Sequence, residues 1–164
     1  MARLLVVHHS PTRAMTTLTD GLVAGTGDPE IEGVDVVVRR ALETDADDLL
    51  AADGYLLATP ANFGYMSGAL KHMFDSTFLH VGGALSDDGS AGEGSEGGTA
   101  GRPFGLLVHG RYDTQGAVRS VLSIVQALKW RQAAEVVEIL GDVTDEHEDL
   151  AYELGGTLAA LLSD

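Results

Sequence analysis

The stretch that decides the fold covers residues 59–75 and reads TPANFGYMSGALKHMFD. It follows the apolar run YLLA at residues 55–58, which is typical of a central parallel strand buried on both faces. Pro60 prevents a helix from beginning at once, and Gly64 allows a tight turn or a close approach of the backbone. Helical spacing then links the apolar residues Met66, Leu70, Met73, Phe74 and Phe78. Because ligands of open α/β sheets bind beyond the carboxyl ends of the strands, this loop predicts a ligand site.

The rest of the chain alternates strand and helix in the same way. Apolar runs predict strands at residues 4–8, 34–40, 55–58, 104–109 and 136–140. Amphipathic spacing predicts helices at residues 12–24, 44–52, 67–78, 116–129 and 145–162. This alternation predicts a doubly wound, five-stranded parallel α/β sheet in three layers, formed by a single domain over residues 1–164. Alternation alone also permits a response-regulator receiver domain.

Residues 59–75 resemble the T-P-x-x-x-G-x-x-x-x-x-L-K-x-x-x-D signature of the flavodoxin-like NAD(P)H-dependent FMN reductases and quinone reductases. The matching residues are Thr59, Pro60, Gly64, Leu70, Lys71 and Asp75. The resemblance implies the flavodoxin-like strand order 2-1-3-4-5, and the second strand, with its Asp and two Arg residues, suits the edge position in that order. It also implies FMN as the cofactor, NADH or NADPH as the electron donor, and an isoalloxazine ring held by Thr59, Pro60, Ala61, Asn62, Phe63 and Gly64. Taken from the residues alone, ordinary packing explains Phe63 and Tyr65 equally well.

The loop after the first strand, residues 9–17, reads HSPTRAMTT and combines hydroxyls with the free amides of a helix N-terminus. These groups suit a phosphate monoester, although a Ser or Thr that only caps an ordinary helix fits them as well. Ser10 and Thr12 match the first two hydroxyl positions of the flavodoxin phosphate loop, T/S-x-T-G-x-T. The resemblance therefore implies that the FMN phosphate is held by Ser10, Thr12 and the amides of Arg13, Ala14 and Met15. Arg13 stands where the family often has Gly, and Met15 where it has Thr; the Arg13 side chain either adds charge to this grip or points to water.

The loop after the fourth strand, residues 109–116, reads HGRYDTQG and reaches the same edge of the predicted sheet. In flavodoxin-like proteins the corresponding loop covers the other side of the flavin ring. The resemblance thus implies a cofactor contact by His109, a stacking ring from Tyr112 and amide contacts from Gly110 and Thr114. Arg111 either stabilises negative charge on the reduced flavin or is an ordinary surface residue.

Composition narrows the function classes. The absence of cysteine excludes thiol catalysis, disulfides and thiolate metal sites, and it is compatible with a reducing cytoplasm. No stretch reaches the roughly 18 apolar residues of a membrane span, and no signal-peptide cleavage site is recognisable, so we expect a cytoplasmic protein without a membrane span. The formal net charge of −15, from 25 acidic and 10 basic residues, disfavours nucleic acid as a partner. The same acidity suits basic redox partners, plain solubility or a salt-loving host.

Residues 86–101 interrupt the alternation with a run of Gly, Ser and acidic residues that has no apolar period, so we expect a mobile loop. Within it, residues 92–97 fit the dinucleotide pattern G-x-G-x-x-G. No predicted strand precedes this match, no helix follows it, and its two Glu residues would repel a pyrophosphate, so we reject it. Because the loop follows a predicted helix, we expect its base at the end of the sheet away from the ligand crevice. A solvated tether is favoured over a lid or a subunit contact.

Other chemistry lacks the residues that it needs. The six histidines show no metal-ligand spacing, residues 142–149 lack the Gly of a calcium loop, and no nucleophile elbow is present, so we expect no metal and no catalytic side chain. Trp130 is expected to pack in the core.

The expected function is that of an FMN-dependent NAD(P)H oxidoreductase, in which FMN does the chemistry and the acceptor is a quinone, a flavin or a nitro compound. Two alternatives stay open. One is a flavodoxin-type electron carrier without NAD(P)H turnover, and the other is an FMN-free binding or regulatory module, which the departures at Arg13 and Met15 keep open. Reductases of this fold are often homodimers or homotetramers, and the resemblance allows either.

Overall fold

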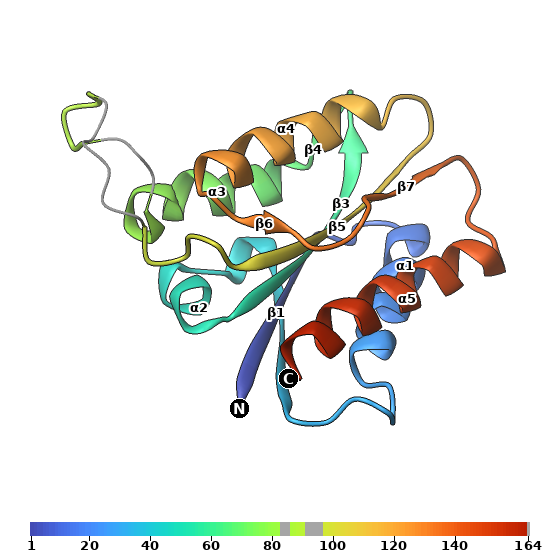
Figure 1. Cartoon of the computed structure of the whole chain (residues 1–164). Coiled ribbons are helices and arrows are strands. Elements are labelled where there is room, and N and C mark those ends of the chain that lie inside the picture. The colour runs from blue at the N-terminus through green and yellow to red at the C-terminus, as the bar shows by residue number, and fades with distance from the viewer. Residues whose placement is uncertain (83–85, 91–96, 164) are drawn as a thin grey trace.

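The structure is a computed structural model that describes residues 1–82, 86–90 and 97–163. Its centre is a parallel sheet with helices on both faces (Figure 1). Across the sheet the strands lie in the order β2 (Val34–Arg40), β1 (Ala2–His8), β3 (Gly54–Asn62) and β5 (Pro103–Gly110). The fifth position is divided between β6 (Arg131–Gln132), beside the start of β5, and β7 (Val137–Leu140), beside its end. The predicted parallel sheet and its order 2-1-3-4-5, with the second strand at an edge, are confirmed.

The two faces of the sheet bury separate sets of side chains, because successive residues of a strand point to opposite sides. On one face, Leu4 and Val6 of β1 pack with α1 (Arg13–Thr26) and α5 (Asp145–Leu162). On the other face, Leu5 and Val7 belong to a core covered by three helices, α2 (Ala46–Ala51), α3 (Gly68–Val81) and α4 (Gln115–Ala127). The result is the predicted three-layer α/β arrangement, visible in Figure 1.

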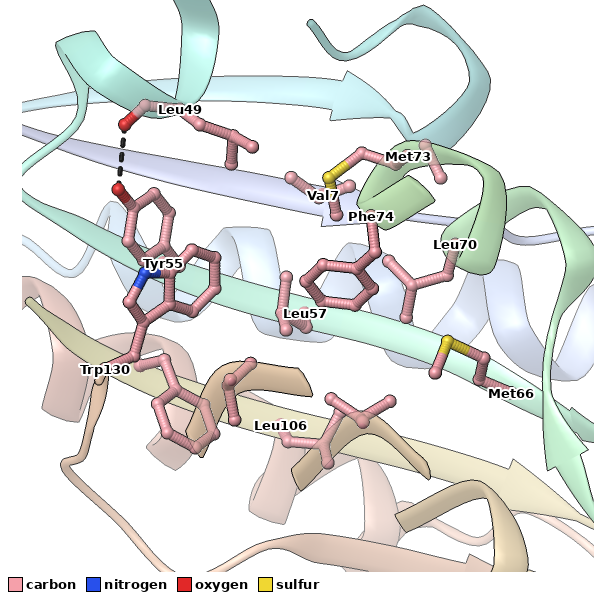
Figure 2. Close-up of a cluster of buried hydrophobic side chains, with 14 of the residues drawn as sticks. Val7, Leu49, Tyr55, Leu57, Met66, Leu70, Met73, Phe74, Leu106 and Trp130 are labelled. Carbon is pink, nitrogen blue, oxygen red and sulfur yellow. Dashed lines mark hydrogen bonds between the residues drawn. The ribbon is translucent and has the colours of Figure 1, made fainter. Parts of the chain in front are cut away.

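The core under α2, α3 and α4 includes an aromatic cluster around Trp130 at the amino end of the sheet (Figure 2). Trp130 is buried, as predicted, and stacks on Tyr55 with ring centroids 3.9 Å apart. The Tyr55 hydroxyl donates to the Leu49 carbonyl at 2.8 Å, and Arg102 donates to both oxygens. Burial raises the pKa of Tyr55, so the phenol stays protonated and keeps its donor role.

Three predicted boundaries were wrong. The helix predicted at 44–52 covers only Ala46–Ala51, as α2, because Asp45 and Asp48 form a capping box that begins it at Ala46. A separate 3₁₀ turn, η1 (Ala41–Glu43), precedes it and was not predicted. The strand predicted at 136–140 forms only the second part of the fifth sheet position, as β7. The first part is β6, whose two residues are polar. The third strand continues to Asn62 and turns back into a short antiparallel strand, β4 (Tyr65–Met66).

The ends of the Gly, Ser and acidic loop meet at the start of β5. A Cβ added to Gly82 would lie 2.2 Å from Gly97 Cα, so two backbones touch here. Thr99 donates to the Val81 carbonyl at 3.1 Å and accepts from Trp130 Nε1 at 2.9 Å. The base of the loop thus lies at the amino end of the sheet, as predicted. Residues 83–85 and 91–96, which include most of the rejected G-x-G-x-x-G match, lie outside the described residues, and the mobility of the loop stays a prediction.

Candidate cofactor site

Three loops meet beyond the carboxyl ends of β1, β3 and β5 and enclose a cavity of about 480 Å³, within the range of ligand sites. We call this cavity the cleft. It is lined by Thr12, Ala14, Pro60, Ala61, Asn62, Phe63, Gly64, His109, Gly110, Arg111, Tyr112 and Asp113. Of the residues predicted to bind the cofactor, those outside this lining are Ser10, Arg13, Met15, Thr59 and Thr114. Asp113 was not predicted.

The loop after β3 is a tight hairpin. Asn62 pairs with Tyr65, which leaves Phe63 and Gly64 as a two-residue turn. Both have positive φ, 52° and 71°, the backbone of the turns that match the twist of a hairpin. Phe63 is fully exposed at the tip although a bulky residue disfavours this backbone. The Phe63 ring therefore lies in solvent at the wall of the cleft, although aromatic side chains are usually buried and bulky residues rarely adopt a positive φ.

Thr59 fixes the base of this hairpin from inside the protein. Its side chain is fully buried and accepts a hydrogen bond from the Ser67 amide at 3.0 Å. Ser67 in turn caps α3 by accepting from the Leu70 amide at 3.2 Å. Thr59 therefore positions the loop and the helix that follows it, and its side chain is not part of the cleft wall.

The hairpin rests on the beginning of α4. A Cβ added to Gly116 would lie 1.9 Å from the Gly64 carbonyl oxygen, so only glycine permits this contact. The Met66 amide donates to Ser120 Oγ at 3.3 Å and ties β4 to the same helix. Asp113 accepts from the Gln115 amide at 3.1 Å, and its other carboxylate oxygen would be 2.9 Å from a Cβ at Gly64. An Asp two residues before a helix is a recognisable capping signal, and it could have revealed Asp113.

The loop before α1 presents backbone donors. Thr12 is the N-cap, and its hydroxyl accepts from the Met15 amide at 3.2 Å, so that amide already has a partner. Among the residues that the structure describes, no acceptor is recorded for the amides of Ser10, Thr12, Arg13 and Ala14. Such amides at a helix N-terminus fit a phosphate group.

The Ser10 hydroxyl already has two partners. It lies 2.9 Å from His8 Nδ1 and 2.8 Å from Thr19 Oγ1, so it ties the loop to β1 and α1. Burial, and then the neighbouring charges of Arg40 and His9, lower the pKa of His8, so its ring is neutral at pH 7. In this arrangement Ser10 can serve a bound phosphate through its amide, while its hydroxyl orders the loop.

The charge at the start of α1 differs from that at the starts of α2 and α5. The first turns of α2 and α5 carry acidic residues, which suit the positive end of the helix dipole. The first turn of α1 has no acidic residue and begins with Arg13. The Arg13 cation is repelled by the positive end of the helix dipole, and a bound anion would offset this repulsion.

The loop after β5 forms the opposite wall. Tyr112 is almost fully exposed, and Arg111 pairs with Asp142 at 2.7 Å. His109 Nε2 donates to the Gly141 carbonyl at 2.7 Å and holds the loop after β7 against β5. Thr114 is buried and its hydroxyl donates to Glu138, which places this side chain outside the cleft.

The remaining signature residues have structural partners. Lys71 and Asp75 form an ion pair at 2.7 Å along α3, which raises the pKa of Lys71, and Leu70 is buried in the core. In the described parts of the chain, no group of three or more His, Asp or Glu side chains is arranged to hold a metal ion. No described helix is both long and apolar enough to cross a membrane.

Comparison with known proteins identifies a matching family and a similar sequence. The family model described as NADPH-dependent FMN reductase matches residues 28–142, which include the hairpin and the Tyr112 loop but not the loop before α1. A flavodoxin of Aquifex aeolicus (strain VF5) is 27% identical over 129 residues, which cover 71% of this chain and 69% of that protein.

Solved structures show the same fold. A flavodoxin from the domain Archaea superposes with a TM-score of 0.77 at 15% identity, covering 99% of each chain. Flavodoxin 1 of Bacillus cereus gives 0.76 at 12% identity over 99% of this chain and 100% of that one. A WrbA-like flavodoxin of Agrobacterium tumefaciens gives 0.68 at 11% identity over 99% and 98%. The predicted flavodoxin-like fold is confirmed.

Proposed function

The chain belongs to the NADPH-dependent FMN reductase family, and we propose that it binds FMN in the cleft and passes electrons from NADH or NADPH to a small acceptor such as a quinone, a free flavin or a nitro compound. The observation that carries this proposal is the pair of exposed aromatic residues, Phe63 and Tyr112, on the two loops that wall a cavity of about 480 Å³ beside the amides of α1. A flat aromatic ligand with a phosphate tail satisfies both features.

In this proposal each loop has a separate task. The amides of Ser10, Thr12, Arg13 and Ala14 hold the FMN phosphate, and the Met15 amide supports them through the Thr12 cap. The hairpin and the Tyr112 loop orient the ring and exclude water from it. Bound FMN supplies the hydride and electron chemistry, so no catalytic acid, base or nucleophile is needed. Arg111 places a positive charge at the cleft, where it favours the reduced flavin.

The second candidate is a flavodoxin-type carrier that receives electrons from a protein partner. The net charge of −15 supports it, because an acidic carrier can dock on basic redox proteins. The third candidate, an FMN-free module, rests on the departures of Arg13 and Met15 from the phosphate-loop pattern of the family. The Met15 side chain is buried, and its amide is used by the cap, so this departure leaves the other loop amides available.

A homodimer or homotetramer is part of the proposal. Phe63, Tyr112 and Leu140 are exposed apolar side chains on loops and a strand end around the carboxyl edge of the sheet. A second copy that covered them would complete the wall of the cleft. We also propose a cytoplasmic location, with which the absence of cysteine is compatible.

The test begins with purified protein saturated with FMN and then desalted. A flavin spectrum that survives desalting and is bleached anaerobically by NADPH or NADH supports the reductase. Retention of flavin without bleaching favours the carrier. Loss of flavin on desalting contradicts both flavin functions.

A further inference from the structure

Asp113 carries the one carboxylate among the described residues that line the cleft. With histidine counted as neutral, the other charged residue of this lining is Arg111, which has a carboxylate partner of its own in Asp142 at 2.7 Å. No cationic group lies within ion-pair distance of Asp113 in the described parts of the chain. The cleft wall therefore holds a negative charge that no ion pair neutralises.

We propose that Asp113 lowers the affinity of the cleft for reduced FMN relative to oxidised FMN. The ring of FMN is neutral when oxidised, and it is anionic when it has taken up two electrons and one proton. A fixed carboxylate at the wall repels only the anionic ring. Weaker binding of the reduced form lowers the reduction potential of bound FMN and makes it a stronger reductant toward its acceptor. The inference rests on the function proposed above, because it concerns the flavin of that site.

The Asp113 carboxylate lies where the two walls of the cleft meet. Asp113 follows Tyr112 in the loop after β5, and its Oδ2 would be 2.9 Å from a Cβ at Gly64, so it approaches the backbone of the hairpin turn. Phe63, beside Gly64, and Tyr112 carry the exposed rings of these two walls. A flavin ring held between the two walls would therefore lie close to this carboxylate.

The two oxygens of this carboxylate have different surroundings. Oδ1 accepts from the Gln115 amide at 3.1 Å and from the Gly116 amide at 3.5 Å, at the start of α4. These bonds fix the direction of the side chain, and the positive end of the α4 dipole offsets part of its charge. Oδ2 has no recorded donor in the part of the chain that the structure describes. We therefore expect the repulsion to be modest but directed from a fixed position.

Asparagine at position 113 separates the charge from the structural role. Its side-chain oxygen can accept from the same two amides, and Asn caps a helix about as well as Asp does. D113N therefore removes the charge and keeps the cap, whereas D113A removes both.

The test measures the affinity of the protein for both forms of FMN. Fluorescence titration gives the dissociation constant of oxidised FMN, and anaerobic dithionite titration against a reference dye gives the potential of bound FMN, from which the affinity for reduced FMN follows. D113N should bind reduced FMN about fivefold more tightly relative to oxidised FMN, which raises the potential of a two-electron couple by about 20 mV. Its melting temperature should stay within about 1 °C of wild type, whereas that of D113A should fall by about 3 °C.

Two further variants test whether the effect comes from local charge. R111Q removes the opposite charge from the cleft lining and should lower the potential. D47N removes an exposed carboxylate from the first turn of α2, outside the cleft lining, and is the matched control. It should leave the potential unchanged; a shift as large as that of D113N would assign the effect to the net charge of the protein and overturn the inference.

An equal potential in D113N and wild type also overturns the inference. So does loss of oxidised FMN in D113N, which would make Asp113 a structural part of the cleft. The proposed function can fail separately, because dithionite rather than NADPH or NADH reduces the flavin in this test. A shifted potential without bleaching by either nucleotide would keep the inference and remove the reductase, whereas wild type that binds no FMN would remove both.

Discussion

The two ends of the same sheet are built in opposite ways. At the amino end, Trp130 stacks on Tyr55, and Arg102 donates to the carbonyl and hydroxyl oxygens beneath them. At the carboxyl end, Phe63 and Tyr112 are exposed, and several amides before α1 have no acceptor in the described structure. Since the same strands run through both ends, the difference lies in the loops and helix ends that the strands connect.

This contrast separates stability from binding. At the amino end, packed aromatic rings and satisfied donors stabilise the folded domain. Exposed rings, amides without a protein acceptor and a left-handed Phe63 are not expected to stabilise the folded state by themselves, and a bound ligand would give them partners. Substitutions at the amino end should therefore change the free energy of unfolding, and those at the carboxyl end the affinity for FMN.

The largest expected effect is that of Trp130→Ala. Removing the buried ring should lower the free energy of unfolding by about 3–5 kcal/mol, from the lost burial and the cavity left beside Tyr55. Urea denaturation measures this loss. Trp130→Phe, which keeps a ring, should cost much less. FMN affinity, titrated where the variant is still folded, should stay within about twofold of wild type; a large loss of affinity with little loss of stability would contradict the division between the two ends.

Gly116→Ala and Gly82→Ala form a matched pair, because each Cβ would meet backbone at about 2 Å, at the carboxyl and the amino end respectively. Each should cost about 1–3 kcal/mol of stability through overpacking, and Gly82→Ala should cost more than Gly116→Ala because Gly82 has a φ of 115°. Only Gly116→Ala should displace the hairpin through the Gly64 carbonyl, and it should weaken FMN binding about tenfold or more. Gly68→Ala, with open space around its Cβ, is the control. Equal FMN affinity in the Gly116 and Gly82 variants would show that the hairpin does not shape the site.

The fold was predictable because its signals are local and periodic. Alternating apolar runs and helical spacing located every main strand and helix, and the charges of β2 placed it at the edge. The division of the fifth position was missed because pairing with β5 decides it, and the start of α2 was missed because the Asp45 cap decides it. Neither feature follows from hydrophobic periodicity.

Side-chain direction was less predictable than loop position. The sequence placed Thr59 and Thr114 in site loops, yet both hydroxyls point into the protein to the Ser67 amide and to Glu138. The Ser10 hydroxyl is similarly hydrogen-bonded to that of Thr19. These outcomes depend on partners far along the chain or on a neighbouring helix, which a local motif does not contain.

A smaller effect is expected at the two described non-glycine residues with positive φ, Phe63 at the carboxyl end and Lys129 at the amino end. Replacing either with Gly should stabilise the fold by up to about 1 kcal/mol by relieving the left-handed backbone, less the entropy that Gly adds to the unfolded chain. Phe63→Gly should also weaken FMN binding about tenfold, because it removes a ring from the cleft wall, whereas Lys129→Gly should leave binding unchanged. Melting temperature and FMN titration measure the two effects. If Phe63→Gly and Lys129→Gly give the same result in both assays, the Phe63 ring has no role in the site.

The smallest effect concerns pH at the carboxyl end. Burial, Arg40 and His9 lower the pKa of His8, so the folded protein favours the neutral ring. The unfolded chain then binds more protons between the lowered pKa and the ordinary value of about 6.5, and the stability that depends on a neutral His8 is present above this window and lost as pH falls through it. Wild type should therefore lose more melting temperature than His8→Gln between about pH 7.5 and pH 5. His80→Gln is the control for loss of an exposed imidazole. If His8→Gln and wild type lose stability in parallel, the buried ring is not the group that titrates. If FMN affinity falls with pH in wild type but not in His8→Gln, the contact from His8 to Ser10 also transmits protonation to the loop proposed for the phosphate.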